Sequence, residues 1–185
     1  GPDLEEVAAP LGRRGVGLRR LEAGDTFAGR FVISSLIGEG GTGSVYRAED
    51  RLTRQPVALK LIRAGREGPA AREALIQEAV TTRGVRHNNV IAVYDAGDAD
   101  GQAYMTMELL SGQSLRAWMR AMMIKDAQCS FVCAARIVTA VLDGLEAAHK
   151  QGVVHRDLKP ENIYLTGDPE EGRVDLKIID FGLAR

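Results

Sequence analysis

Two polar strings in the last third of this 185-residue chain constrain its fold more than any other feature. They are residues 155–162, His-Arg-Asp-Leu-Lys-Pro-Glu-Asn, and residues 180–182, Asp-Phe-Gly. Each follows a short apolar run, and their side chains include the carboxylates of Asp157 and Asp180, a lysine and a carboxamide. A fold that brings these groups together could hold Mg²⁺ and the phosphates of a nucleotide while a hydroxyl is aligned for attack.

Each polar side chain in these strings has a chemistry that fits such a site. Asp157 can orient a hydroxyl and accept its proton, and Lys159 can neutralise charge on a moving phosphoryl group. Asn162 and Asp180 offer the hard oxygen ligands that Mg²⁺ prefers. Pro160 stiffens the loop and keeps it out of a helix. Any one of these residues alone would fit an ordinary surface loop, so the prediction depends on the whole set.

A glycine cluster lies upstream, where residues 38–45 match the pattern G-x-G-x-x-G-x-V. Glycines let backbone N–H groups approach phosphate oxygens closely, although a tight hairpin in any β protein has the same appearance. A dinucleotide-binding fingerprint needs a following helix and an acidic residue about 20 positions on. Here residues 45–48 are strand-like, Arg63 stands near that position, and the Gly-Lys-Ser/Thr of a Walker loop is absent. The pattern therefore favours a flap over a nucleotide, formed by Gly38, Gly40, Gly41 and Gly43.

Lys60 lies inside the apolar run 57–62, which we expect to be a strand. A lysine there either reaches water at a sheet edge or is a buried cation that needs a counter-charge. The following helix offers Glu73 and Glu78. Glu78 falls within the apolar stripe of that helix, whereas Glu73 falls nearly opposite. We therefore expect Lys60 to pair with Glu78, the alternative being a solvated helix with unpaired charges.

Bulk composition is ordinary for a globular protein. Apolar residues make up 45% of the chain, and the net charge of −1 gives no reason to expect a nucleic-acid partner. No apolar run reaches the ~18 residues of a membrane span, and no secretory leader is visible. We therefore expect a cytoplasmic location for these residues, while further regions of a parent protein could anchor it to a membrane.

The two cysteines, Cys129 and Cys133, are four residues apart in a helix-like stretch. This spacing places them on one face, where a metal pair or a disulfide is conceivable. No other cysteine and no nearby histidine completes a metal site. We expect reduced thiols in the core of a cytosolic protein.

The apolar patterns predict strands and one helix first, and mostly helix afterwards. Residues 1–24 lack periodicity and favour a flexible, solvated arm. A helix is expected over about 69–83, another just after Ser114, and a long one over about 131–150, ended by Gly152. Strands are expected at 31–33, 36–37, 45–48, 57–62, 90–94, 102–107, 153–154, 163–165 and 174–179.

With these motifs in place, the chain resembles a eukaryotic-type (Hanks-type) protein kinase, in particular the bacterial serine/threonine kinases. The resemblance covers about residues 31–185. It rests on the glycine loop, on the string Val57-Ala58-Leu59-Lys60, and on residues 155–162 and 180–182, which match without change. It implies an α+β kinase-like fold. Residues 25–110 would form an antiparallel-sheet N-lobe with one helix, and residues 111–185 would form the first part of a helical C-lobe.

The resemblance also implies roles for individual residues. Lys60 would hold the α/β-phosphates of ATP and pair with Glu78, Asp157 would be the catalytic base, Lys159 would assist it, and Asn162 and Asp180 would bind Mg²⁺. Met107 would be the gatekeeper, and the carbonyl of Glu108 and the N–H of Leu110 would bond adenine. The residues expected to sandwich the base are Ile37, Val45, Ala58 and Tyr164.

Three departures from the family pattern stand out. Asn88 occupies a position where the family usually has proline. Thr82 occupies a position where the regulatory spine commonly has a larger apolar residue, its other members being Val93, His155 and Phe181. The sequence stops at Arg185, so the activation segment, the Ala-Pro-Glu motif and the downstream helical block lie outside it.

The function implied by the resemblance is ATP- and Mg²⁺-dependent phosphorylation of serine or threonine in a protein substrate. The 185 residues alone are expected to be inactive, since the substrate platform is missing. The alternative is a nucleotide-binding or partner-binding module without transfer activity, which could self-associate through the exposed apolar surface of its truncated lobe.

Overall fold

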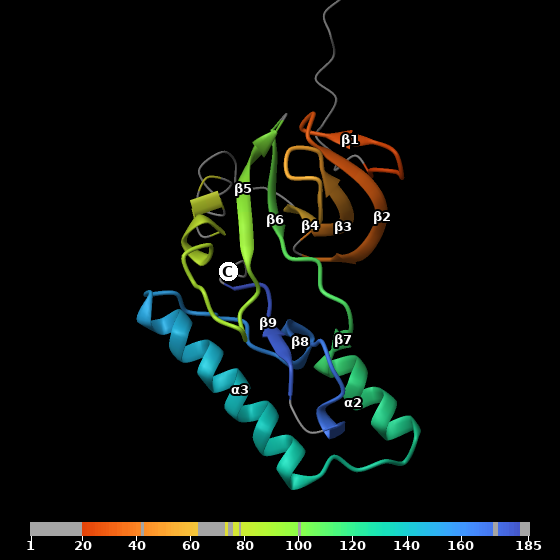
Figure 1. Ribbon diagram of the computed structural model, residues 1–185, viewed down its shortest axis with the longest axis vertical. Coiled ribbons are helices and arrows are strands. Elements are labelled where there is room, and N and C mark those ends of the chain that lie inside the picture. The colour runs from red at the N-terminus through yellow and green to blue at the C-terminus, as the bar shows by residue number, and fades with distance from the viewer. Residues whose placement is uncertain are drawn as a thin grey trace, which may run out of the picture.

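The computed structural model describes residues 20–41, 43–62, 73, 76–77, 79–99, 101–171 and 174–181. Six antiparallel strands form a curled sheet in the order β1-β2-β3-β4-β6-β5, which makes up one lobe (Figure 1). The strands are β1 Thr26–Phe27, β2 Phe31–Gly40, β3 Gly43–Asp50, β4 Gln55–Ile62, β5 Val93–Ala99 and β6 Gln102–Met107. Residues 73, 76–77 and 79–82 are helical.

The second lobe contains two helices and a small three-stranded sheet of order β7-β8-β9 (Figure 1). Ser114 and Ser130 cap the two helices by accepting hydrogen bonds from the N–H groups of Ala117 and Cys133. The elements are β7 Gln113–Ser114, α2 Leu115–Ile124, α3 Phe131–Lys150, η1 Pro160–Asn162, β8 Ile163–Leu165, η2 Pro169–Glu171 and β9 Leu176–Ile178.

Strand β4 is the centre of the first lobe, because it is buried on both faces from Val57 to Ile62. One face contributes Leu59 and Leu61 to a core that includes Phe31 and Tyr46. The opposite face contributes Ala58 and Ile62 to a second cluster. Lys60 lies on this second face and is 2% exposed, so the alternation predicted from the sequence places it in the interior.

Arg30 closes the curl of the sheet by joining strands that are not neighbours. Its guanidinium makes two 2.8 Å hydrogen bonds to the Asp50 carboxylate at the end of β3, and a third of 2.8 Å to Asp95 on β5. It also lies 4.8 Å from the ring centre of Phe31. These charge-assisted bonds lower the pKa of the buried Asp50 from 3.8 to about 2.

Helix α3 and strand β9 approach each other very closely at Gly144. A Cβ added there would lie 2.9 Å from Cδ1 of Ile178 and 3.0 Å from the carbonyl oxygen of Asn89. The same carbonyl accepts the backbone N–H of Ile178, and the Asn89 side chain donates to the carbonyl of Leu176. The segment that contains Asn89 therefore holds β9 against α3.

Most predicted elements are present. The long helix has the predicted bounds, and β4, β6 and β8 fall where expected. Three predictions were wrong in position. Residues 153–154 form no strand, β5 begins at Val93 rather than at 90, and β9 is limited to 176–178. Turn geometry after α3 and the bridge of Val90 to Ile178 take up those residues instead.

The two cysteines differ in their surroundings. Cys133 is a buried core thiol, as expected, but Cys129 is exposed and precedes α3, so the prediction that both lie in the core was wrong for Cys129. Both are free thiols in this structure. The helix begins one residue after the Ser130 cap, which leaves Cys129 outside the helical repeat.

We predict that Asp50→Asn lowers the free energy of unfolding at pH 7 by about 2 kcal/mol, from the depressed pKa of Asp50. A lowered carboxyl pKa stabilises the fold above the unfolded pKa of 3.8, and this contribution is lost as the pH falls through about 2. The difference between wild type and variant in urea unfolding should therefore shrink across that window. Asp95→Asn, at a more exposed site, should cost less than about 1 kcal/mol. Equal losses for the two variants would contradict this assignment.

We also predict that Gly144→Ala destabilises the protein by about 1–3 kcal/mol, because the new methyl group overpacks β9 and Asn89. Glycine to alanine inside a helix ordinarily stabilises by up to about 1 kcal/mol, so the sign here is reversed. Ala135→Gly on the exposed face of α3 measures the propensity term alone. A Gly144→Ala variant as stable as wild type in thermal unfolding would show that the contact is loose.

Candidate active site

Residues far apart in the sequence meet between the two lobes at an ion pair. Nζ of Lys60, on β4, lies 2.6 Å from Oδ1 of Asp180, which follows β9. The lysine side chain is 2% exposed and the aspartate side chain 28% exposed. The ammonium is therefore buried in the upper lobe, while the carboxylate is partly accessible to water.

The loop before η1 is ordered by hydrogen bonds around Asn162. Its side-chain amide donates to the backbone carbonyl of Asp157 at 2.9 Å, with a longer contact of 3.4 Å to Oδ2 of the same residue. Its backbone carbonyl accepts the N–H of Ile179 at 2.9 Å. Asn162 thus connects the loop that carries Asp157 with the segment that carries Asp180.

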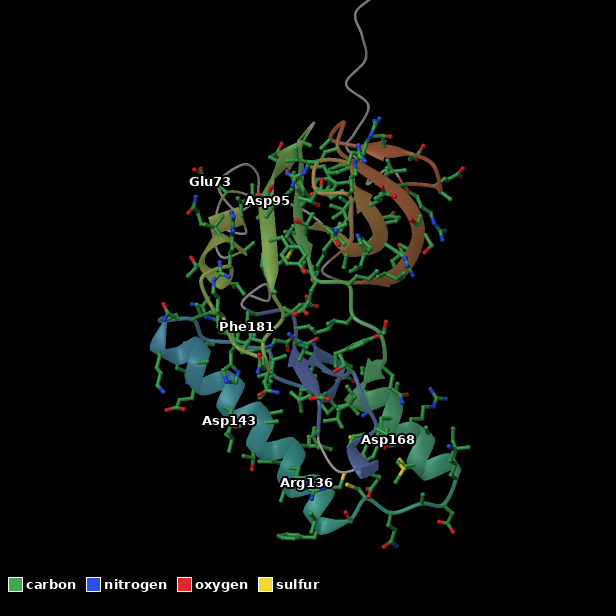
Figure 2. The ribbon with its side chains drawn as sticks, viewed as in Figure 1. Glu73, Asp95, Arg136, Asp143, Asp168 and Phe181 are labelled. Atoms are coloured by element: carbon green, nitrogen blue, oxygen red, sulfur yellow. The ribbon has the colours of Figure 1, made fainter. Side chains whose placement is uncertain are left out.

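Two buried side chains, His155 and Phe181, also connect the loop of Asp157 with the segment of Asp180. A ring nitrogen of His155 lies 2.9 Å from the carbonyl oxygen of Ile179, and the His155 and Phe181 ring centres are 4.7 Å apart. Both side chains are buried, as are Thr82 and Val93, the other residues expected in the regulatory spine. Phe181 is labelled in Figure 2 at the junction of the two lobes.

Asp157 and Lys159 form the charged, accessible part of the site. Nζ of Lys159 donates to Oδ2 of Asp157 at 2.6 Å. This bond holds the pKa of Asp157 below its usual value and raises the pKa of Lys159, to which the charge of Asp180 also contributes. Asp157 is therefore an ionised carboxylate at neutral pH.

Two residues of the site have backbone conformations that L-amino acids rarely adopt. Arg156 has φ of 64° and Asp180 has φ of 58°. A positive φ at a non-glycine residue costs on the order of 1–3 kcal/mol and persists where surrounding contacts hold it. Here those contacts are the bonds of His155 and Asn162 to the backbone of Ile179, which hold the residues next to Arg156 and Asp180 in place.

The connection between the lobes is fixed by Glu108. Its carboxylate accepts the N–H of Ala92 at 2.7 Å and the ammonium of Lys177 at 2.9 Å, and its own N–H bonds the Ala92 carbonyl at 2.9 Å. The Tyr164 hydroxyl donates to the carbonyl of Gly112 at 2.9 Å. The sequence did not indicate the side-chain role of Glu108 or any role of Lys177. The only sign of a role for Lys177 in the sequence was its place between two apolar residues, Leu176 and Ile178, of an expected strand.

An apolar wall lies beside the ion pair on the upper lobe. Ala58 and Met107 are buried in one cluster, against which Val45, Leu110 and Ile179 pack. The predicted base-sandwiching residues therefore divide into two groups. Ala58 and Val45 belong to this wall, whereas Ile37 is 51% exposed at the rim of the sheet.

Other predicted residues lie at the edge of the described structure or outside it. Gly38 faces Val45 across the β2–β3 hairpin, where Gly40 and Gly41 are exposed and Gly43 is buried. Glu78 lies outside the described residues, so its pairing with Lys60 stays a prediction. Glu73 is exposed and lies on the outer side of the upper lobe (Figure 2), which agrees with its rejection as the inward partner.

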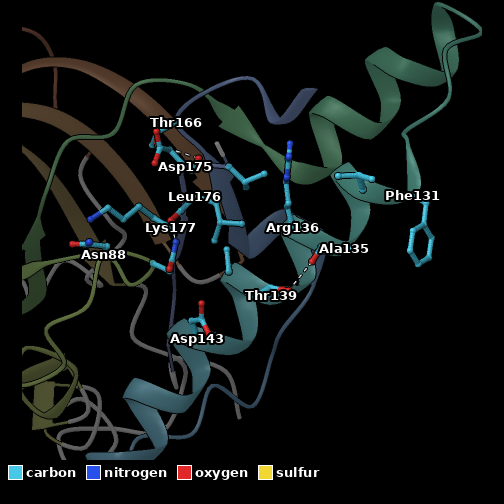
Figure 3. Close-up of a pocket in the computed structure, with 14 residues that line it drawn as sticks. Asn88, Phe131, Ala135, Arg136, Thr139, Asp143, Thr166, Asp175, Leu176 and Lys177 are labelled. Carbon is cyan, nitrogen blue, oxygen red and sulfur yellow. Dashed lines mark hydrogen bonds between the residues drawn. The ribbon is translucent and has the colours of Figure 1, made fainter. Parts of the chain in front are cut away.

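A cavity of about 890 Å³ lies outside the cleft, against α3 and β9 (Figure 3). Polar and charged side chains line much of it, including Asn88, Arg136, Asp143 and Lys177. Arg136 and Asp143 lie on α3 (Figure 2), and neither residues 155–162 nor residues 180–181 line the cavity. This cavity is separate from the candidate active site.

Residues 31–185 match the model of the protein kinase domain. The chain belongs to the protein kinase family. The predicted α+β kinase-like fold is thereby confirmed, with the sheet-rich N-lobe and the start of the helical C-lobe. Among the described residues, no helix is long and apolar enough to cross a membrane.

Relatives with curated names include a probable serine/threonine-protein kinase PknB of Corynebacterium glutamicum, 35% identical over 85% of this chain, and serine/threonine-protein kinase pkn3 of Myxococcus xanthus, 37% identical over 88%. The chain spans 24% of the first and 29% of the second. The crystal structure of the Mycobacterium tuberculosis PknI kinase domain superposes with a TM-score of 0.74 at 28% identity, covering 90% of this chain and 64% of that one.

We predict unequal effects from breaking the Lys60–Asp180 pair. Asp180→Asn leaves a buried ammonium without this carboxylate, whereas Lys60→Met leaves a carboxylate that water already reaches. Asp180→Asn should therefore destabilise more, and the double variant should recover about 1–3 kcal/mol relative to the sum of the single variants. Urea unfolding without nucleotide measures the cycle. Strict additivity would mean that the two groups do not interact in solution.

Proposed function

We propose that this chain is the nucleotide-binding and catalytic-loop part of an ATP- and Mg²⁺-dependent serine/threonine protein kinase. The observation that carries the proposal is the connected set of contacts that pairs Lys60 with Asp180 and joins the segment of Asp180, through Asn162, to the loop of Asp157. In this family such a cleft transfers the γ-phosphoryl group by positioning and charge neutralisation. The activity, substrate and partners of the whole protein belong to this proposal, since the chain spans 24% and 29% of the two named relatives.

The upper lobe supplies groups for the nucleotide. Lys60 would contact the α/β-phosphates, and the backbone of Gly38, Gly40, Gly41 and Gly43 would approach the phosphates from above. The apolar wall of Ala58, Val45 and Met107 would cover adenine, with Ile37 and Tyr164 at its edges. The Glu108 carbonyl and the Leu110 N–H would bond the base edge.

The donor set at the floor of the cleft fits Mg²⁺. Asp180 offers a partly exposed carboxylate. Asn162 offers its carboxamide oxygen, because its NH₂ group already donates a hydrogen bond to the backbone carbonyl of Asp157. Hard oxygen ligands of this kind suit Mg²⁺, which usually also keeps waters and substrate phosphates. When bound, the cation would neutralise phosphate charge and orient the γ-phosphoryl group.

Asp157 would act as the base that accepts the hydroxyl proton of the protein substrate. It is ionised at neutral pH because the bond from Lys159 lowers its pKa. Lys159 would neutralise charge on the moving phosphoryl group, and its pKa is raised by Asp157 and, more weakly, by Asp180. A lysine at this position resembles serine/threonine kinases, and the named relatives carry that description.

Nucleotide binding can be tested on the chain itself. We predict that Mg-ATP raises the melting temperature, by an amount that corresponds to about 2.7 kcal/mol at a nucleotide concentration 100 times Kd. Lys60→Met and Asp180→Asn should each reduce the shift, while Asp143→Asn on α3 should leave it unchanged. No shift with Mg-ATP at any concentration would remove both the kinase proposal and the nucleotide-binding alternative.

Transfer requires the full-length protein. We predict that Asp157→Asn lowers kcat for phosphorylation of a serine- or threonine-containing protein by about 10²–10⁴-fold, with little change in the KM for ATP. The matched control is again Asp143→Asn. Undiminished activity in Asp157→Asn would contradict the role of Asp157. ATP binding by a full-length protein without any transfer would favour the binding-module alternative.

Self-association and cytoplasmic location stay predictions. Exposed apolar side chains on α2 and α3 support a covered face in the complete protein. They are Met119, Met123, Ile124, Phe131, Val132, Val138 and Leu142. Sedimentation of the chain across a concentration series would reveal a dimer, and a monomer at all concentrations would exclude self-association.

A further inference from the structure

A cluster of two thiols and a carboxylate lies at the end of the C-lobe opposite the cleft. The sulfur atoms of Cys129 and Cys133 and a carboxylate oxygen of Glu170 all lie within 4.8 Å of one another. Cys129 precedes α3, Cys133 is in its first turn, and Glu170 belongs to η2 in the β8–β9 connection. Two separate parts of the chain therefore converge on one point.

Backbone and side-chain bonds hold this arrangement in place. The Ser130 N–H donates to the Glu170 carboxylate at 3.3 Å, and the Ser130 hydroxyl accepts the Cys133 N–H at 3.0 Å. On the other side, the Asp168 carboxylate accepts the Glu170 N–H at 3.0 Å. Figure 2 labels Arg136, on α3, and Asp168, just before η2.

The cluster brings together three groups that are all neutral or anionic. Cys133 is buried, and Cys129 and Glu170 lie beside it. Without a cation, two thiolates and a carboxylate at this separation would repel each other. A divalent cation reverses this, because it binds the thiolates and the carboxylate together.

We propose that Cys129, Cys133 and Glu170 bind a zinc-class divalent cation. Thiolate and carboxylate ligands in a set of three, with a fourth position for water, suit zinc better than the hard cation Mg²⁺. Zinc–sulfur bonds of about 2.3 Å in a tetrahedral site separate two sulfurs by about 3.8 Å, which the 4.8 Å limit of this cluster accommodates. Glu170 supplies the third ligand that the cysteine spacing alone does not reveal.

Such a cation would brace the β8–β9 hairpin rather than take part in catalysis. Helix α3 has 20 residues and is about 30 Å long, so its first turn is remote from the loop that follows its last turn. The connection carrying Glu170 joins β8, which starts after Asn162, to β9, which ends before Asp180. Fixing η2 to α3 would therefore anchor the turn of the β8–β9 hairpin, at the end opposite to Asn162 and Asp180.

The chain has two cysteines, which makes the test specific. The reduced chain is titrated with Co²⁺ and then Zn²⁺, with thiolate-to-cobalt absorption, melting temperature and maleimide labelling as readouts. We expect one equivalent to bind, Zn²⁺ to raise the melting temperature, and Cys129 to be protected from labelling. Cys129→Ser should remove roughly half of the absorption, because one of two thiolates is lost. Cys129→Ser and Glu170→Gln should each weaken binding by at least about tenfold.

Both variants change exposed side chains, so the fold should persist, which circular dichroism verifies. Glu146→Gln, at an exposed carboxylate near the other end of α3, is the matched control and should bind like wild type. Binding that survives Cys129→Ser and Glu170→Gln unchanged would assign the cation elsewhere and overturn the proposal. Absence of binding by the reduced chain, with a Cys129–Cys133 disulfide forming in air, would overturn it in favour of a redox pair.

Discussion

The geometry of the cleft depends on one buried ammonium group. Lys60 is held in the most enclosed strand of the upper lobe, where a cation without a counter-charge would be strongly destabilising. Asp180 satisfies it at 2.6 Å across the gap between the lobes. The pair therefore does more than join two side chains, because it fixes where the segment after β9 must pass relative to β4.

The segment from β9 to Asp180 is held by the second lobe mostly through main-chain hydrogen bonds. The Asn89 carbonyl accepts the N–H of Ile178, and the Ile178 carbonyl accepts the N–H of Ile91. Gly144 allows α3 to pack directly against Asn89 and Ile178. Asn162 then ties the catalytic loop to Ile179. Because these contacts form one connected network, the position of Asp180 relative to Asp157 is set by the packing of α3 on β9 as well as by the charged residues themselves. The positive φ values at Arg156 and Asp180 are tolerated for the same reason.

What the sequence predicted well was local. The bounds of α3 were predicted from its apolar stripe and from Gly152, and the structure adds the Ser130 cap. The burial of Lys60 decides between the two alternatives that the sequence left open. The motif residues were placed by resemblance, and the family match confirms the fold in which they occur. The interactions that the sequence did not reveal join residues far apart in the chain, such as Arg30 to Asp95 and Glu108 to Lys177. Periodicity carries no information about such pairs, since each depends on how the sheet curls and how the lobes meet. The same limit explains Glu170, which joins the cysteines only through the path of the β8–β9 connection.

The Lys60–Asp180 pair also determines what a nucleotide must do on entering the cleft. In the structure the two charges neutralise each other directly. If Lys60 turns to phosphate oxygens and Asp180 to a cation, each keeps an opposite charge as its neighbour, so one direct contact is replaced by two ionic contacts with ligand between them. The exchange is feasible because Asp180 is the exposed partner and is linked to the lower lobe, whereas Lys60 is fixed in the sheet. In the proposed function, the network around Asn162 would keep Asp157 and Asp180 in register, and the fixed place of Lys60 in the sheet would give the triphosphate a defined position.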